Sequence, residues 1–158
     1  GHTQGHVCLF DQSRGIFFSG DHVLGDITPN IATWSDSDDP LANYLSSLGK
    51  VESLDVEICF PGHRTPVADF KGRIRELIHH HDERANEVLE ILERGPANAY
   101  DTASRMTWSI RAKSWEDFPV MQRWFATGEA IAHLRYLQGK GQVAQVEEDD
   151  RIIFSVAD

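Results

Sequence analysis

The sequence predicts an α+β protein in two parts, with three short strands and a helix followed by three helices and a β-hairpin. Short apolar runs bounded by Gly, Pro or Asp predict three strands, at residues 7–10, 16–18 and 56–60. Apolar residues at helical spacing predict three clear helices, at residues 40–48, 70–93 and 119–137. A hydrophobic content of 41% with 25% charged residues is ordinary for a globular chain, so we expect no extended disorder.

Residues 1–69 form the first predicted domain. After the loop of residues 24–35, the segment Asp36-Ser37-Asp38-Asp39-Pro40 is a helix start, with Asp as N-cap and Pro at the first helical position. The apolar stripe of this helix consists of Leu41, Tyr44, Leu45 and Leu48. We expect Gly49 to end the helix. One helix and three strands leave a sheet face uncovered, so this part cannot bury a good core alone.

Residues 70–158 form the second predicted domain. Its first helix, at residues 70–93, is the clearest in the chain, because its apolar residues fall on one stripe and Gly95-Pro96 follow it. The stripe consists of Ile74, Leu77, Ile78, His81, Ala85, Val88, Leu89 and Leu92. A short helix is predicted at residues 98–108, and we expect the helix at 119–137 to stop at Gly139.

A β-hairpin ends the chain, with strands at residues 142–146 and 151–156 and a polar tip at 147–150. Three helices followed by a hairpin is the order of a winged helix. Besides the helical stripe, the predicted core of this domain contains Ile131, Leu134, Leu137, Ile152, Phe154 and Val156. We expect Trp108, Trp115 and Trp124 to anchor helix packing.

The net charge of −10 is unevenly distributed. Residues 1–69 hold three basic and ten acidic residues, a net charge of −7, and residues 70–158 hold 12 basic and 15 acidic residues, a net charge of −3. Neither half has the basic surface that duplex DNA requires. No apolar run approaches the roughly 20 residues of a membrane span, and Cys8 and Cys59 read as two buried free thiols. We therefore expect a cytoplasmic protein without membrane contact.

His and Asp residues follow the predicted strands in three Gly-bearing motifs. Gly1-His2-Thr3-Gln4-Gly5-His6 precedes the first strand, Ser19-Gly20-Asp21-His22 follows the second, and Pro61-Gly62-His63 follows the third. Imidazole and carboxylate groups at strand ends can converge on one divalent ion.

In this order the motifs resemble the third, fourth and fifth metal motifs (GHTxGH, SGDH and PGH) of the metallo-β-lactamase superfamily of hydrolases. The resemblance implies the C-terminal part of the αββα fold and a site for two ions, zinc first, with Mn or Fe as substitutes. It assigns His2 to the first ion, His63 to the second, and Asp21 to both. The second motif, HxHxDH, supplies most ligands in the family and does not occur in this chain. We therefore expect the C-terminal portion of a longer hydrolase, inactive alone, with an empty or partial metal site.

The intact enzyme that the resemblance implies would hydrolyse an ester, thioester or phosphodiester by attack of a metal-bound hydroxide. Its substrate would be a small molecule or RNA, and Asp21 would position the hydroxide. His22 is a candidate substrate contact or an orienting residue. Thr28 and Asn30 are candidate substrate contacts or turn caps.

The other histidines have structural interpretations. We expect His6 to donate to a backbone carbonyl rather than to bind metal. Residues His79, His80 and His81 lie on a helix, where neighbours are about 100° apart, so they cannot face one ion. We expect His81 in the core and His79 in solvent.

The second part also resembles the winged-helix domain attached to β-lactamase-like members of the superfamily. The resemblance rests on residues 78–84, on Val88-Leu89, on residues 132–137 and on Gly141-Gln142-Val143. Four carboxylates at the hairpin tip oppose phosphate contact, so we expect a role in packing, substrate gating or homodimer formation. The rival interpretation is a winged-helix module for RNA binding or assembly, joined to a remnant half-domain.

Overall fold

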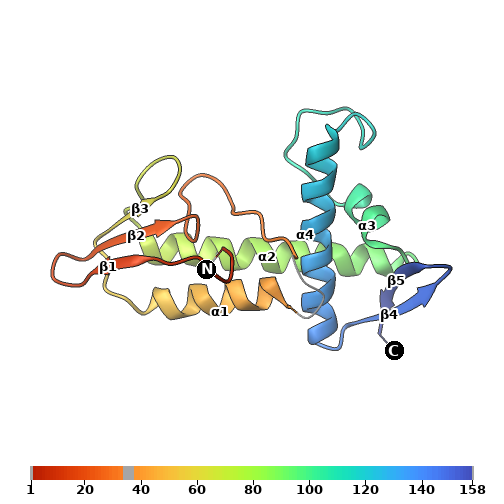
Figure 1. Ribbon diagram of the computed structural model, residues 1–158, viewed down its shortest axis with the longest axis horizontal. Helices are drawn as coiled ribbons and strands as arrows, with labels where there is room; N and C mark the ends of the chain where they lie inside the picture. Colours follow the sequence, from red (N-terminus) through yellow and green to blue (C-terminus); the bar gives the residue numbers. More distant parts are fainter. Residues whose placement is uncertain (1, 34–37, 158) are drawn as a thin grey trace. The chain divides into compact units, whose positions relative to one another are not determined.

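A computed structural model describes residues 2–33 and 38–157 (Figure 1). The helices are α1 (Pro40–Glu52), α2 (Phe70–Glu93), α3 (Ala99–Arg105) and α4 (Val120–Gly139). The strands are β1 (Leu9–Asp11), β2 (Ile16–Gly20), β3 (Ile58–Pro61), β4 (Val143–Glu148) and β5 (Arg151–Val156). The mixed α+β prediction is confirmed. Gly1 of the first motif, residues 34–35 of the predicted loop, and Asp36-Ser37 of the predicted helix start lie outside the described residues.

The chain divides into two compact units. The first contains residues 1–31 and 40–82, and the second contains residues 32–39 and 83–158. The division falls inside α2, whereas the domain boundary expected from sequence lies at the start of that helix, between residues 69 and 70; that boundary stays a prediction. In the described part of the chain, no helix combines the length and apolar character that a membrane crossing requires.

The first unit contains a sheet of order β1-β2-β3, with β1 antiparallel and β3 parallel to β2. Figure 1 shows this sheet beside α1 and the first half of α2. Phe17 of β2 is buried with its ring 5.1 Å from that of Phe70 of α2, so this sheet face is covered. Leu9, Phe18 and Phe60 form a cross-strand row on the opposite face and are all exposed. The prediction of one uncovered sheet face is therefore confirmed.

Helix α1 buries Leu41, Tyr44 and Leu48 as predicted, but it does not end at Gly49. It continues to Glu52 because Val51, three residues beyond Leu48, extends the apolar stripe and is half-buried. A glycine within a helix costs only about 1 kcal/mol, which the added burial can offset.

The second unit packs the later part of α2, α3 and α4 against the base of the β4–β5 hairpin. The buried positions confirm the prediction for Leu134, Leu137 and Phe154. The prediction is wrong for Ile152 and Val156, which are 48% and 39% exposed, and Ile131 is only half-buried. The reason is that the hairpin meets the core around Phe154, whose backbone pairs with Ala97, and the neighbouring positions extend beyond that contact.

Helix α4 and the hairpin end differently from the prediction. Gly139 is the last residue of α4 rather than its stop signal, and the left-handed residue after the helix is Gly141, with φ +71°. The strands run through Glu147 and Glu148, so the hairpin tip is the pair Asp149-Asp150, with φ values of 49° and 59°. Two successive residues with positive φ are typical of a two-residue type I′ turn, and Asp tolerates this region better than most residues.

A buried arginine connects three segments of the second unit. The Arg84 guanidinium donates to Glu87 Oε2 at 2.6 Å and to the Thr107 carbonyl at 2.7 Å, and it lies 3.4 Å from Glu129. It also lies 4.3 Å from the centroid of the Trp108 ring. Trp108 and Trp115 pack against the core of this unit, as predicted. The prediction is wrong for Trp124, which is 53% exposed.

Candidate metal centre

Asp21 and His63 meet at the carboxyl ends of two adjacent parallel strands. Asp21 follows β2 directly, and His63 lies two residues beyond the end of β3. Because parallel strands end at the same edge of a sheet, the two side chains converge, and His63 Nε2 lies 3.4 Å from Asp21 Oδ1. Both side chains remain accessible to solvent, so this pair can receive a ligand.

Two glycines make this approach possible. The Gly62 N–H donates to the Gly20 carbonyl at 2.7 Å, and a Cβ atom at position 62 would lie 2.8 Å from Asp21 Oδ1. Gly20 has a φ of +52°, and a Cβ atom there would lie 2.5 Å from Nε2 of His6. Steric crowding therefore explains why glycine occurs at these positions of the second and third motifs.

The turn that carries Asp21 is held by side chains on both sides. Ser19 Oγ donates to the Val23 carbonyl at 2.7 Å, and the buried Tyr44 hydroxyl donates to the His22 carbonyl at 2.9 Å. The sequence predicts Tyr44 in the core but does not predict its hydrogen bond to the His22 carbonyl. The available signal was that a buried tyrosine hydroxyl needs a hydrogen-bond partner.

His6 is structural, as predicted, but its hydrogen bond runs the opposite way. The Asp21 backbone N–H donates to His6 Nε2 at 3.1 Å, so the ring accepts from an amide instead of donating to a carbonyl. This assigns the ring proton to Nδ1. Burial, the positive chain terminus and His2 lower the pKa of His6, which favours the neutral ring that such an acceptor needs.

His22 lies inside the first unit rather than on its surface. Its ring is buried, its Nε2 lies 3.3 Å from Ser47 Oγ, and its ring centroid lies 5.4 Å from that of Tyr44. Burial lowers the pKa of His22 to about 4. These contacts are those of a residue that orients the Asp21 turn, and a substrate contact at His22 stays a prediction.

The buried His22 predicts a loss of stability in acid. Its pKa is depressed in the folded state, so its contribution is complete above the unfolded pKa of 6.5 and is lost as the pH falls toward 4. Between pH 7 and pH 5 we expect His22 to account for roughly 2 kcal/mol of lost unfolding free energy. Urea unfolding at both pH values should show a smaller pH difference in His22→Gln. The exposed-site control His79→Gln should keep the full difference, and equal behaviour of the two variants would contradict the prediction.

The remaining predicted site residues lie on two other segments. The His2 ring centroid lies 6.5 Å from that of His6, and its buried Nδ1 has no hydrogen-bond partner among the described residues. Thr28 and Asn30 are half-buried in a loop that Arg73 holds through the carbonyls of Leu24 and Ile27. Their roles in metal and substrate binding stay predictions.

The described residues fit part of a metal site. The 3.4 Å separation of Asp21 and His63 suits two donors of one ion, and imidazole and carboxylate are suitable donors for zinc. Within residues 2–33 and 38–157, however, no three His, Cys, Asp or Glu side chains come together in a metal-binding group. A complete site therefore needs donors in addition to this pair.

His81, His79 and Cys59 lie as expected, whereas Cys8 is less buried than predicted. His81 is buried with its ring 5.5 Å from that of Tyr44, and His79 is exposed. Cys59 is a buried free thiol, and Cys8 is a half-buried one. The Cys59 thiol donates to Ser19 Oγ at 3.3 Å.

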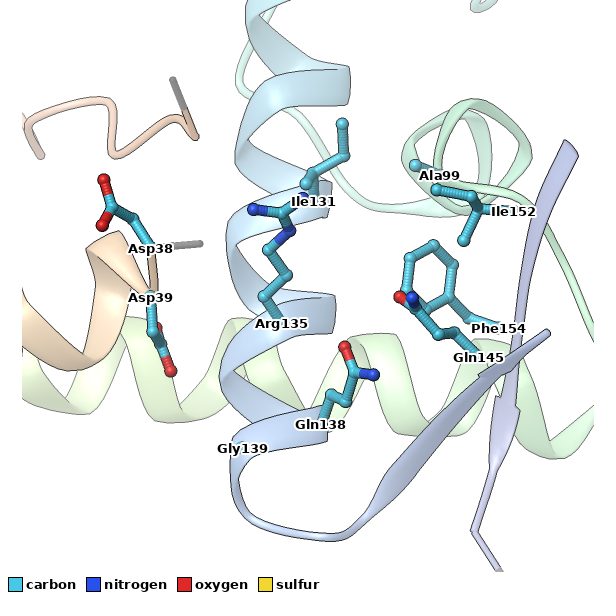
Figure 2. Close-up of a pocket in the computed structure, with 10 residues that line it drawn as sticks. All are labelled: Asp38, Asp39, Ala99, Ile131, Arg135, Gln138, Gly139, Gln145, Ile152 and Phe154. Carbon is cyan, nitrogen blue, oxygen red and sulfur yellow. The ribbon is translucent and has the colours of Figure 1, made fainter. Parts of the chain in front are cut away.

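A separate cavity of about 600 Å³ lies in the second unit, between α4 and the hairpin (Figure 2). Figure 2 shows Arg135 and Gln138 on α4 facing a wall that includes Ile152 and Phe154, with Asp38 and Asp39 on the opposite side of the helix. The full lining is Asp38, Asp39, Ala99, Ile131, Arg135, Gln138, Gly139, Gln145, Ile152 and Phe154. None of the residues predicted to bind metal or substrate lines this cavity.

Comparison with known protein families finds one match in each part of the chain. Residues 1–63 match the family described as the metallo-beta-lactamase superfamily, and residues 85–157 match the metallo-beta-lactamase-like C-terminal domain. Both stretches are therefore similar to domains of the metallo-β-lactamase superfamily. The second match covers the three-helix and hairpin region but does not describe it as a winged helix, so that interpretation stays a prediction.

Individual relatives resemble most of the chain. The solved structure of a beta-lactamase domain protein from Burkholderia ambifaria is 33% identical, with a TM-score of 0.87 over 99% of this chain and 46% of its own. A probable metallo-hydrolase of Bacillus subtilis, YqjP, is 24% identical over 98% of this chain and 47% of its own. The atrochrysone carboxyl ACP thioesterase of Aspergillus fumigatus is 28% identical over 80% of this chain and 40% of its own. The chain thus spans about half the length of these relatives.

Proposed function

We propose that this chain carries part of the active site of a metal-dependent hydrolase. Asp21 and His63 would serve as ligands, together with His2, and the remaining donors would come from residues outside these 158. The supporting observation is the 3.4 Å approach of Asp21 Oδ1 and His63 Nε2 at the ends of β2 and β3. Chance alignment of surface side chains does not account for it, because Gly20 and Gly62 leave the space that the approach requires.

The proposed reaction is hydrolysis of an ester-like bond, with a thioester as the first candidate. When bound, two metal ions would supply an activated water and a Lewis acid for the developing oxyanion. Asp21 would be a ligand of these ions, and its carboxylate would accept a hydrogen bond from a water at this strand edge. The thioesterase relative favours a thioester over the other classes. The nitrogen and oxygen donors suit zinc, with manganese or iron as substitutes.

Adding the missing donors tests this proposal. We expect the 158-residue chain alone to release no thiol from a simple acyl thioester above background. The same chain joined to a segment that carries HxHxDH should gain zinc-dependent turnover that EDTA abolishes. The measurement is thiol release with and without added zinc, and robust EDTA-sensitive turnover by the chain alone would contradict the proposal.

For residues 70–158 we propose a winged helix that does not bind duplex DNA tightly. The order of three helices followed by a hairpin supports the winged-helix fold. The weak DNA binding is supported by the carboxylates of Asp149 and Asp150 at the hairpin tip and of Glu147 and Glu148 in the adjoining strand, because they repel phosphates. Titration with duplex DNA at low and moderate salt measures the affinity. A submicromolar, salt-dependent dissociation constant would contradict the expected weak binding.

A further inference from the structure

His6 connects the turn of the first motif with the turn that carries Asp21. The first turn is closed by the His6 N–H, which donates to the Thr3 carbonyl at 3.1 Å. The His6 ring then reaches across to accept the Asp21 N–H at 3.1 Å. No spare space separates the ring from the second turn, since a Cβ atom on Gly20 would lie 2.5 Å from His6 Nε2.

From this geometry we infer that His6 is a positioning residue, which holds the Asp21 peptide group so that its carboxylate stays directed at His63. A hydrogen bond that holds the Asp21 N–H keeps its N and Cα atoms in place, and so limits the region that the Cβ atom and the carboxylate can reach. His6 does this without meeting metal or substrate itself, because Nε2 is occupied by the amide and Nδ1 is buried. The consequence for catalysis rests on the proposed function, whereas the contact with Asp21 does not.

The decisive feature is the acceptor on the ring, rather than the volume of the ring. His6→Phe keeps an aromatic ring of similar size and removes the acceptor. His6→Gln restores an acceptor oxygen at about the same reach as Nε2. His79→Phe makes the same change at an exposed position of α2 and serves as the matched control.

The first measurement uses the ¹⁵N-labelled 158-residue chain without metal. We expect His6→Phe to raise the hydrogen-exchange rate of the Asp21 amide at least about tenfold and to shift the ring signals of His63. In His6→Gln, the exchange rate of the Asp21 amide and the ring signals of His63 should return most of the way to those of the unsubstituted chain. His79→Phe should change neither quantity. Unchanged exchange in His6→Phe would overturn the inference, as would a His6→Gln variant that behaves like His6→Phe.

The second measurement is the zinc affinity of the chain joined to an HxHxDH segment. Loss of a residue that orients a ligand typically costs about 10–100-fold in metal affinity, and we expect a loss in that range for His6→Phe and none for His79→Phe. Unchanged zinc affinity alongside faster Asp21 exchange would overturn positioning in favour of a purely structural role. If even the unsubstituted joined protein bound no zinc, the proposed function would fail, and the exchange and ring signals would still decide whether His6 holds Asp21.

Discussion

Asp21→Asn is expected to reduce turnover by more than about 100-fold in the chain joined to its missing ligand segment, and to weaken zinc binding at the same time. The substitution keeps the shape of the side chain but removes the negative charge that the ions would share. Loss of residues that only orient a ligand already costs about 10–100-fold, so loss of a bridging carboxylate should cost more. The side chain is accessible and contacts His63, so we expect the fold to survive. Thioester kinetics and zinc titration calorimetry measure the two effects.

Asp82→Asn is the matched control for this experiment. It makes the same chemical change at an exposed position of α2 and should leave turnover and zinc affinity within twofold of the unsubstituted protein, as expected of an exposed site. If Asp21→Asn retained both bound ions and full turnover, Asp21 would not be a shared ligand, and the assignment from the second motif would be wrong.

Arg84→Ala is expected to destabilise the second unit by about 3–5 kcal/mol, the range for breaking a buried ion pair by removing one partner. The side chain of Arg84 is 9% exposed, and its loss would remove the cation beside the half-buried Glu87 and Glu129. Arg84→Lys should recover only part of this, because one ammonium cannot replace a guanidinium that contacts Glu87, Glu129 and the Thr107 carbonyl together. Urea unfolding followed by tryptophan fluorescence reports the change, since Trp108 lies beside the guanidinium.

The control is a second paired arginine of α2. Arg75 donates to Glu52 at 3.0 Å, but its side chain is 70% exposed. An exposed pair contributes about 0–1 kcal/mol, so Arg75→Ala should scarcely change the unfolding midpoint. Equal destabilisation by the two substitutions would show that burial of Arg84 does not decide its contribution.

Features that depend on neighbouring residues in the chain could be predicted from sequence. The bounds of α2 agree with the predicted residues 70–93, because a long apolar stripe and a closing Gly-Pro pair are local signals. The strands at both ends of the chain were found for the same reason. The helix ends were less predictable, since Gly49 and Gly139 were read as stops although packing of Val51 and the left-handed Gly141 decide where those helices end.

The exposure of particular apolar residues could not be predicted from periodicity. Ile152 and Val156 lie two residues on either side of the buried Phe154, on the same face of the strand, yet they lie beyond the part of the hairpin that the helices cover. Periodicity identifies which side chains share a face, but not how far the opposite surface extends. The same limit applies to Trp124, which lies on a helix whose partner surface stops short of it.

The sequence by itself determined which residue types stand at the candidate site, their order, and the glycines beside them. Motif and context alone single out Asp21, His63 and His2. Only the tertiary structure decided that β2 and β3 run parallel and adjacent, which brings Asp21 within 3.4 Å of His63 although 41 residues of chain separate them. It also decided the direction of the His6 hydrogen bond, which depends on which backbone group faces the ring. Residue type limits what a side chain can bind, and the packing of distant segments decides what it meets.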